Sequence, residues 1–297
     1  MPQQLCVASI GFFDGVHVGH RYLISQVKEA ASRLGMASAL ITFPVHPRLV
    51  MNADYTPELL TSYEEKIDLL AATGIDYCIV LPFTPDIARF TARDFMNTIL
   101  KNQCHVGALV IGHDHRFGHN RTDDFTDYCA YGRELGIEVI RGRACVLHNT
   151  TVSSSVIRRL IREGDIALAN RYLGYNYRLE GVVTDGHKVG RTLGFPTANL
   201  QIRQTFKLLP PDGVYAVHVE VDGKEYAGML NIGQRPTMDN GTNRSIEVHI
   251  LQFNSDIYDF PLTLRFVQFI RNELKFASKE ALKEQLEADR RRVEELL

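Results

Sequence analysis

The first side chains that could carry out chemistry are two histidines in the stretch GFFDGVHVGH, which spans residues 11–20. His17 and His20 follow a short apolar run and lie where a helix is expected to begin. Glycines let the backbone pass close to a ligand, and the free N–H groups at a helix start attract phosphate. Imidazoles there can donate hydrogen bonds to phosphate oxygens as negative charge shifts during group transfer. The stretch therefore favours a phosphate site, and a glycine turn with incidental histidines remains an alternative.

A metal site is the second alternative for the same two histidines. Zinc requires a third or fourth ligand, which Asp14 and His46 could supply. No second ligand pair at a recognisable spacing appears, so phosphate is the better interpretation. The chain also lacks G-x-x-x-x-G-K-[ST] and G-x-G-x-x-G, which excludes a P-loop NTPase and a standard dinucleotide fingerprint.

Three further stretches of the first half could supply cations and hydroxyls to a phosphate. They are TFPVHPR (residues 42–48), GHDHRFGHNR (residues 112–121) and SSSVIRR (residues 153–159). The last combines serines with Arg158 at an expected helix start, which suits phosphate binding. A plainer interpretation exists for each, since Ser153 can be a simple helix N-cap and the histidine-rich stretch a solvated loop.

In the second half, the stretch DGHKVGRTLGFPTANLQI (residues 185–202) repeats glycine every four residues, with Lys188 and Arg191 between them. This pattern is typical of a flexible cationic loop that could wrap phosphates. Thr197 and Asn199 offer two oxygens on one side of an extended strand, and such oxygens suit Mg²⁺. An ordinary barrel loop is the alternative.

Three charged residues near the C-terminus are also candidates. Glu247, in SIEVHIL, alternates with apolar residues and could be a general base for a hydroxyl nucleophile. A solvated glutamate on the outer face of a strand would show the same alternation. Arg271 and Glu273, in IRNELKF, could form a surface ion pair.

These candidates fall into two predicted domains. Residues 1–177 alternate apolar strands with helices, which predicts βαβ units around a parallel sheet, and active sites lie outside the carboxyl ends of such strands. Residues 178–297 show short alternating strands and the hairpin signal Asp222-Gly223, which predict a mostly antiparallel barrel. A C-terminal helix from about Ser278 to Leu297 is expected to close this second domain.

Composition limits the possible partners and location. A formal net charge of −2 argues against a dedicated nucleic-acid binder, and nothing resembles a transmembrane span or a signal peptide. The five cysteines are scattered without CxxC spacing, as in a reducing cytosol. We therefore expect a cytoplasmic protein that acts on small molecules, with no nucleic-acid or membrane partner.

Taken together, these stretches resemble the bifunctional bacterial riboflavin kinase/FAD synthetase family over nearly the full chain. The first half is similar to the family's FMN adenylyltransferase module, a Rossmann-like nucleotidyltransferase domain of the HxGH type, through GFFDGVHVGH, TFPVHPR, IGHDHRFGHNR and SSSVIRRLIREGDI. The second half is similar to its riboflavin kinase module through GRTLGFPTANL, GVYAV, NIGQRPT, EVHIL and IRNELKF. HxGH marks a broad superfamily, whereas GRxLGFPTAN is a very specific string.

The resemblance implies two ATP-dependent reactions. In the second domain the 5′-hydroxyl of riboflavin would attack the γ-phosphate of ATP to give FMN. In the first domain the phosphate of FMN would attack the α-phosphate of a second ATP, which releases pyrophosphate and forms FAD. Mg²⁺ is the implied cofactor.

The resemblance also implies roles for individual residues. Glu247 would be the base of the kinase, and the other catalytic residues would be His17, His20, Asp114 and Arg158. ATP would be bound by Gly11, Phe12, Asp14, Gly19, Ser154, Ser155, Gly190, Arg191, Gly194, Thr197 and Asn199. The flavins would contact His46, Arg48, Arg271 and Glu273. Mg²⁺ would be held by Thr197 and Asn199.

The chain departs from the family pattern at a few positions. Phe12 stands where relatives often have Asn, and Ser155 where Thr is common. His113 and His115 also replace residues that are usually of other types. These departures concern the flavin side of the first domain more than its ATP site.

Two other classes of function remain as competitors. A non-catalytic flavin or nucleotide regulator on the same folds would not require a candidate base and Mg²⁺ ligands. A nucleic-acid protein using RRLIRE or RRR would be expected to be basic and to interleave aromatic with basic residues. The sequence favours the enzyme over both.

Overall fold

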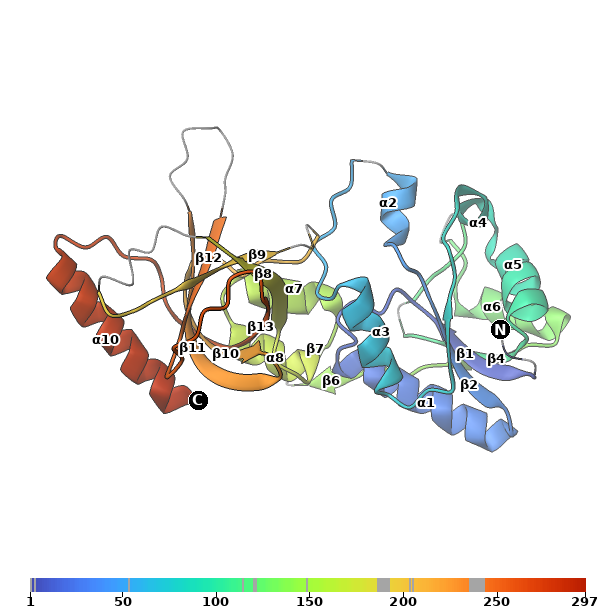
Figure 1. The fold of residues 1–297 in the computed structure, drawn as a ribbon. Helices are drawn as coiled ribbons and strands as arrows, with labels where there is room; N and C mark the ends of the chain where they lie inside the picture. The colour runs from blue at the N-terminus through green and yellow to red at the C-terminus, as the bar shows by residue number, and fades with distance from the viewer. Residues whose placement is uncertain are drawn as a thin grey trace. The chain divides into compact units, whose positions relative to one another are not determined.

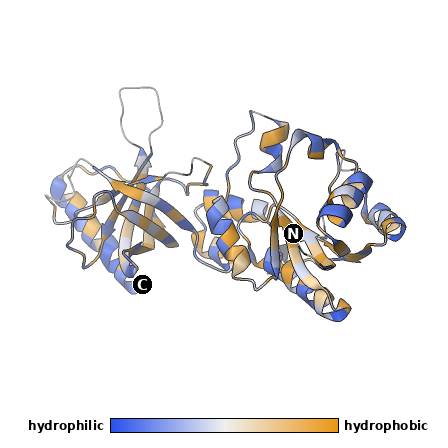
Figure 2. Ribbon diagram, turned by 45° about the vertical axis from the view of Figure 1, so that its right-hand side comes forward, coloured by the Kyte–Doolittle hydropathy of each residue, from blue (hydrophilic) through white to orange (hydrophobic). Residues whose placement is uncertain are grey.

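The computed structural model describes the chain of 297 residues apart from residues 1, 3, 53, 114, 120–121, 148, 186–192, 203, 205 and 235–243. The chain forms two compact units, Met1–Ser154 and Ser155–Leu297 (Figure 1). Hydrophobic residues follow the strands inside each unit, whereas hydrophilic residues cover much of the C-terminal helix (Figure 2).

The first unit is built on a parallel sheet with the strand order β3-β2-β1-β4-β5. The strands are β1 (Cys6–Ile10), β2 (Ala37–Thr42), β3 (Tyr77–Val80), β4 (Val106–Ile111) and β5 (Glu138–Arg141). The central strands β1 and β2 are buried at every position, because helices cover both faces of a parallel sheet.

Two sets of helices cover this sheet. Helix α1 (Val18–Leu34) packs on the face that carries Val7 and Ala108, and the other face is covered by α5 (Ala92–Phe95), the π-helix η1 (Met96–Gln103) and α6 (Phe125–Leu135). The strand order reverses between β1 and β4, and ligands of such sheets bind outside the carboxyl ends of the strands at this reversal. The GFFDGVHVGH stretch follows β1 at that end.

The remaining elements of this unit are short connections. They are α2 (Pro47–Met51), α3 (Tyr63–Ala71), α4 (Pro85–Arg89), β6 (Val146–Leu147) and β7 (Thr150–Thr151). Ser62 caps α3 in a capping box with Glu65, so the start of this helix is fixed by local hydrogen bonds.

The second unit is a closed antiparallel barrel with the strand order β10-β11-β12-β9-β8-β13. Its strands are β8 (Arg178–Thr184), β9 (Ala198–Ile202), β10 (Gly213–Val221), β11 (Lys224–Gln234), β12 (Arg244–Ile250) and β13 (Pro261–Arg271). Asp222 (φ 50°) and Gly223 (φ 70°) form the predicted tight hairpin, and the C-terminal helix α10 (Lys279–Leu296) begins at the cap Ser278. The parallel-sheet and barrel fold classes are therefore confirmed.

The helices α7 (Ser154–Arg162) and α8 (Ile166–Leu173) precede the barrel. Helix α8 packs on β13, where the Asn170 side chain donates a hydrogen bond to the Phe266 carbonyl at 2.8 Å. Residues 155–177 thus group with the barrel. The assignment of residues 1–177 to one activity and residues 178–297 to the other stays a proposal.

Candidate functional sites

The loop after β1 has an unusual backbone. Phe13 (φ 55°), Gly15 (φ 80°) and Val16 (φ 34°) all lie in the left-handed region within four residues. For residues other than glycine this region is sparsely populated, and it persists only where the surroundings hold it. The loop is therefore shaped by its contacts rather than by local preference.

Asp14 supplies most of those contacts. Its side chain is buried, and its carboxylate accepts hydrogen bonds from the backbone N–H groups of Leu60 (2.9 Å) and Thr61 (3.1 Å) and from the Thr61 hydroxyl (3.2 Å). The Gly15 N–H in turn donates to the Thr61 hydroxyl at 3.1 Å, and the Ser154 hydroxyl donates to the Asp14 carbonyl at 2.9 Å. This carboxylate thus fastens the loop to residues 60–61, and its role toward ATP stays a prediction.

The two histidines lie together at the start of α1. His17 is the N-cap, and its Nδ1 accepts a hydrogen bond from the His20 N–H at 3.2 Å. Their rings stack with centroids 3.6 Å apart. Because Nδ1 of His17 accepts, the neutral ring carries its proton on Nε2, which makes Nε2 a donor.

His20 is held in its neutral form. Its ring is partly exposed, but its Nδ1 atom is buried and makes no hydrogen bond within the described residues. Burial, together with the nearby His17 and His115, keeps the pKa of His20 well below its ordinary value. As the pH falls, the unfolded chain binds a proton at this residue before the folded chain does. The free energy of unfolding therefore decreases below about pH 6.5. At neutral pH the ring is an uncharged donor.

Gly19 is required for this arrangement. A Cβ atom at residue 19 would lie 2.9 Å from the Val152 carbonyl oxygen and 3.0 Å from ring atoms of His17. At Gly11 a Cβ atom would lie 3.2 Å from the Phe13 ring. The glycines thus leave room for the packed rings, and the close approach of this backbone to a ligand stays a prediction.

Phe12, His46 and Arg48 lie along a series of aromatic contacts. The rings of Phe12 and His46 meet edge-on with centroids 4.8 Å apart, and His46 is 5.5 Å from Tyr55. His46 caps α2 through Nδ1, which accepts from the Arg48 N–H at 3.2 Å, and the Arg48 guanidinium lies 5.7 Å from the Tyr55 ring centroid. The structure therefore links Phe12 to the two predicted flavin residues.

The remaining candidates of the first half lie on α7 or outside the described residues. Ser155 and Arg158 lie on α7 in the second unit, and their part in ATP binding stays a prediction. Asp114, Gly190 and Arg191 fall outside the described residues.

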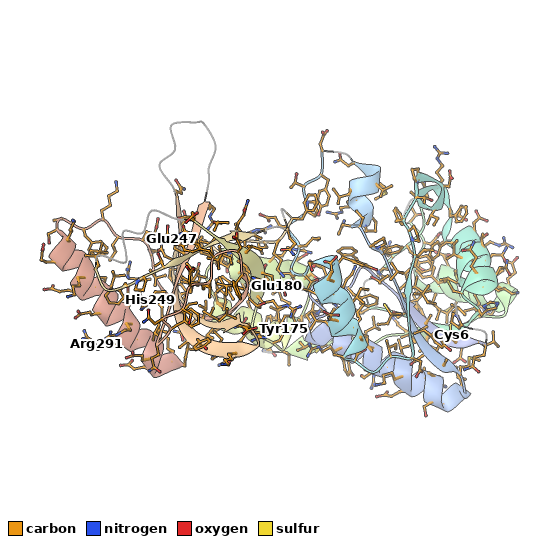
Figure 3. The ribbon with its side chains drawn as sticks, viewed as in Figure 1. Cys6, Tyr175, Glu180, Glu247, His249 and Arg291 are labelled. Carbon is orange, nitrogen blue, oxygen red and sulfur yellow. The ribbon has the colours of Figure 1, made fainter. Side chains whose placement is uncertain are left out.

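The barrel brings polar residues from several strands into one row. Asn199 of β9 pairs directly with Glu247 of β12, and Glu247 pairs directly with Asn231 of β11. Directly opposed residues of an antiparallel sheet project from the same face. The row continues through Val214 to Arg271 of β13. Glu247 and His249 are labelled on β12 in Figure 3.

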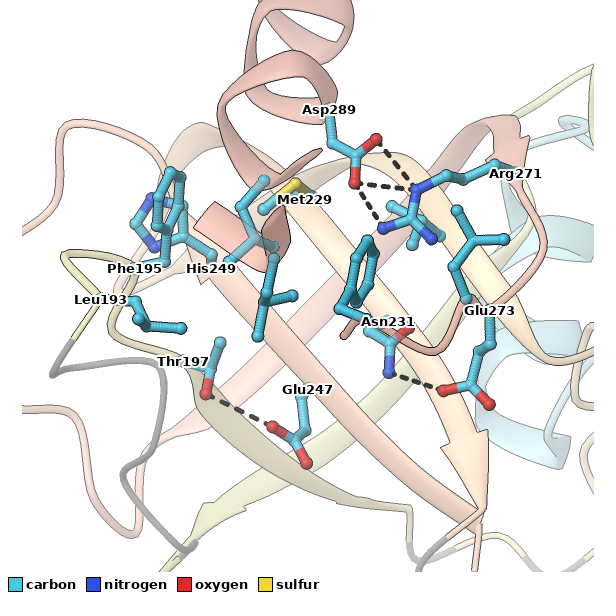
Figure 4. A pocket seen from close by; sticks show the side chains of 15 residues that line it. Leu193, Phe195, Thr197, Met229, Asn231, Glu247, His249, Arg271, Glu273 and Asp289 are labelled. Carbon is cyan, nitrogen blue, oxygen red and sulfur yellow. Dashed lines mark hydrogen bonds and ion pairs between the residues drawn. The ribbon is translucent and has the colours of Figure 1, made fainter. Parts of the chain in front are cut away.

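Thr197 completes the polar group around Glu247. Its hydroxyl donates to Oε2 of Glu247 at 3.4 Å, while the Asn231 amide donates to Oε1 of Glu273 at 3.2 Å (Figure 4). Glu273 passes so close to β11 that a Cβ atom at Gly233 would collide with its carboxylate. The predicted base, the predicted Mg²⁺ ligand Thr197 and the predicted flavin residue Glu273 are thus brought together.

A cavity of about 360 Å³ opens beside this row (Figure 4). Its apolar wall includes Leu193, Phe195, Met229, Phe276, Leu282 and Leu286. A large apolar wall with a few convergent polar groups is typical of a site for a planar, drug-sized ligand. Gly194, at φ 85°, borders this wall with open space around its Cα.

Arg271 pairs with Asp289 of α10 and not with Glu273. Its Nε lies 3.0 Å from both carboxylate oxygens and its Nη2 lies 2.7 Å from Oδ2 (Figure 4). The Asp289 side chain is only 2% exposed, and Gln285 donates a further hydrogen bond to it at 2.8 Å. This bidentate pair joins α10 to the strand that carries the cavity wall.

Sequence reasoning missed four residues of these sites: Lys66, Asn231, His249 and Asp289. Asp289 has a visible signal, because it falls on the helix face of Leu286 and Val293. His249 donates a hydrogen bond from Nδ1 to the Pro196 carbonyl at 2.8 Å, and burial lowers its pKa although this hydrogen bond opposes the shift.

Comparison with known proteins gives two family matches. The FAD synthetase family matches residues 1–156, and the riboflavin kinase family matches residues 173–297. Curated relatives named bifunctional riboflavin kinase/FMN adenylyltransferase include those of Listeria monocytogenes, Pseudomonas fluorescens and Escherichia coli K12. The Listeria protein is 38% identical over 95% of this chain and 90% of its own length. The Pseudomonas protein is 37% identical over 96% of this chain and 90% of its own length. The Escherichia protein is 36% identical over 97% of this chain and 91% of its own length.

A solved structure, described as a macrolide-efflux protein from Streptococcus pneumoniae, is also similar. It superposes with a TM-score of 0.91 at 30% sequence identity, over 99% of this chain and 95% of the other. Within the part of the chain that the structure describes, no helix is both long and apolar enough to cross a bilayer.

The Arg271–Asp289 pair yields a test of how α10 is held. Asp289→Ala leaves a largely buried guanidinium without its carboxylate, which costs about 3 kcal/mol. We expect the amides of α10 to exchange roughly 100-fold faster in hydrogen-exchange mass spectrometry, if opening of the helix controls their exchange.

The control is Arg292→Ala, which breaks the exposed Arg292–Glu295 pair on the same helix and should change exchange by no more than about threefold. The double variant Arg271→Met/Asp289→Leu should recover most of the protection, because apolar replacements remove both charges together. Wild-type exchange in Asp289→Ala would show that the pair does not hold the helix.

Proposed function

The chain belongs to the bifunctional riboflavin kinase/FMN adenylyltransferase family, and we propose how its residues divide the two reactions of that family. The enzyme phosphorylates riboflavin to FMN and transfers an adenylyl group from ATP to FMN. The observation that carries the division is that each polar group lies in a different unit. The histidine pair follows a parallel strand of the first unit, and the row around Glu247 crosses the barrel of the second.

In the barrel, Glu247 is the base for phosphorylation of riboflavin. Its carboxylate takes the proton of the 5′-hydroxyl as that oxygen attacks the γ-phosphorus of ATP and ADP leaves. Support comes from its place beside the cavity, half-buried and next to the Thr197 hydroxyl at 3.4 Å. The apolar wall receives the isoalloxazine ring, and Arg271 and Glu273 also line this cavity.

The donor set beside Glu247 fits Mg²⁺. Thr197 offers a hydroxyl oxygen, and Asn199 lies directly opposite Glu247, so hard oxygen donors gather at one place. Mg²⁺ bound there with ATP neutralises charge on the phosphates. Thr197 and Asn199 would hold the ion, and Gly194 with the neighbouring Gly190 and Arg191 would border the phosphates.

In the first unit, FMN itself is the nucleophile. Its phosphate oxygen attacks the α-phosphorus of ATP and pyrophosphate leaves, so no base is needed to remove a proton at neutral pH. Nε2–H of His17, the His20 ring and the N–H groups that open α1 donate hydrogen bonds to the phosphates. Because His20 is neutral, these rings orient the phosphates rather than supply a full positive charge. Ser154, whose hydroxyl donates to the Asp14 carbonyl, would contact the triphosphate, and the roles of Asp114, Ser155 and Arg158 toward it stay predictions from the sequence.

We also propose a cytoplasmic location and small-molecule partners, namely riboflavin, FMN and ATP, without nucleic acid. All five cysteines are free, and such thiols are typical of a reducing compartment.

His20→Ala tests the first site. The change removes one phosphate donor and the ring on which His17 stacks, so adenylylation of FMN should fall about 100-fold. Chromatography of reactions with riboflavin and ATP should then show FMN accumulating in place of FAD. The control His105→Asn replaces an exposed histidine of the same unit at φ 53° and should leave FAD formation unchanged. Unimpaired FAD formation in His20→Ala would remove this residue from the site.

Thr197→Ala tests the second site. Loss of the hydroxyl should lower phosphorylation of riboflavin by about 100-fold, because phosphoryl transfer depends on placing charges around the phosphates. The same protein should convert supplied FMN to FAD at the wild-type rate. Equal loss of both steps with FMN supplied would contradict the division of activities between the units.

A further inference from the structure

Lys66 is a buried cation that no role above accounts for. It lies on α3 and is only 1% exposed, although lysine is almost never fully buried. A residue that served only to fill space there would be apolar, because a buried ammonium loses its hydration. Its position therefore calls for a partner that benefits from the charge.

The ammonium joins the ends of two neighbouring strands. Nζ of Lys66 donates a hydrogen bond to the Phe43 carbonyl at 2.7 Å and lies 3.9 Å from the centroid of the Phe12 ring. Phe43 directly follows β2, and Phe12 lies just beyond β1. The Thr42 hydroxyl strengthens this junction by donating to the Phe12 carbonyl at 3.2 Å. The Phe12 ring is thus held against the cation.

Phe12 also belongs to the series of aromatic contacts with His46 and Tyr55. Its ring contacts His46, which leads to Tyr55 and Arg48, and Val45 and Met51 of the same segment are exposed. Aromatic rings in edge-on and tilted contact, with an exposed apolar border, suit an aromatic ligand better than a phosphate. Phe12, His46 and Tyr55 are named here the aromatic wall.

The surroundings keep Lys66 charged at neutral pH. Burial lowers its pKa to about 8, while the Asp14 carboxylate of the β1 loop and Cys78 of β3 act in the opposite direction. Burial raises the pKa of the Cys78 thiol, which is therefore uncharged at neutral pH. On its own helix, the Tyr63 ring lies 5.9 Å from Nζ. A cation held against an aromatic face in a water-poor site is worth more than the same contact at the surface.

We propose that Lys66 is a positioning residue for FMN in the adenylylation site: it acts through Phe12, fixing the aromatic wall and placing a positive charge beneath it. The inference rests on the proposed division of the two reactions. The flavin ring lies on the aromatic wall. The buried positive charge favours binding of FMN because the phosphate of FMN is anionic. ATP is held at the other end of the loop, by the histidines.

The test uses the full-length chain with FMN and ATP supplied, and FAD is measured by chromatography. Lys66→Met keeps the length of the side chain but removes its charge, so KM for FMN should rise at least about tenfold while KM for ATP changes less than about twofold. Lys66→Arg keeps the charge and should stay within about threefold of the wild type for FMN. The control Lys28→Met removes an exposed lysine of the same unit and should change neither KM.

Several outcomes would overturn the inference. An unchanged KM for FMN in Lys66→Met would remove Lys66 from the site, and a rise confined to KM for ATP would place the wall on the adenine side. A parallel rise in both KM values, with no rescue by Lys66→Arg, would reduce Lys66 to a structural residue. Phosphorylation of riboflavin by the same protein reports separately on the fold of the second unit.

The pH dependence of the wild type gives a readout that needs no variant. Because Lys66 loses its proton above about pH 8, kcat/KM for FMN should decline through that range, and Lys66→Arg should move the decline beyond about pH 9. A wild-type profile that stays flat to about pH 9.5 would overturn the inference. If the wild type made no FAD from FMN at all, the proposed function would fail instead.

Discussion

The buried carboxylate of Asp14 is the interaction on which the first site depends. The loop from Phe12 to His17 takes left-handed backbone conformations at Phe13 and Val16, and each costs on the order of 1–3 kcal/mol for a non-glycine residue. The hydrogen bonds from residues 60–61 to Asp14 offset that strain. The same bonds hold residues 60–61, which lead directly into α3, and α3 carries Lys66. One carboxylate thus determines both the histidine end and the aromatic end of the site.

The two units position their chemistry in different ways. In the first, the carboxyl ends of parallel strands converge, and loops of unusual conformation carry the functional groups. In the second, the register of a closed barrel places Asn199, Glu247 and Asn231 side by side on regular strands. Regular strands hold side chains more rigidly than loops do. This rigidity suits a reaction in which one carboxylate has to contact one hydroxyl. Phosphate binding, in contrast, uses many weak hydrogen-bond donors.

Much of this architecture follows from local sequence signals. Apolar strands alternating with helices predict the parallel sheet, Asp222-Gly223 predicts the hairpin, and Ser278 marks the start of the last helix. Each of these depends on residues close together in the chain. The glycine spacing around His17 and His20 predicts a close approach of the backbone to a ligand, whereas the structure shows Gly19 packed against the Val152 carbonyl and the His17 ring.

The parts that sequence reasoning missed depend on distant pairings. Nothing near Lys66 in the chain indicates that its ammonium reaches Phe43 and Phe12, because that contact requires the order of β1 and β2 in the sheet. The alternation around Glu247 does not reveal which face points to the cavity until its register with β9 and β11 is known. The sequence suggests that Arg271 pairs with the nearby Glu273, whereas its partner Asp289 lies on another element.

The most direct test of this account is the effect of Asp14→Ala on the two activities of one protein. The change removes the oxygen that accepts from the N–H groups of Leu60 and Thr61, which leaves these buried donors unpaired at about 1–3 kcal/mol each. We predict that the rate of FAD formation from FMN falls at least about 100-fold while phosphorylation of riboflavin stays within about twofold of the wild type. FAD formation at the wild-type rate would contradict the claim that this carboxylate holds the site together.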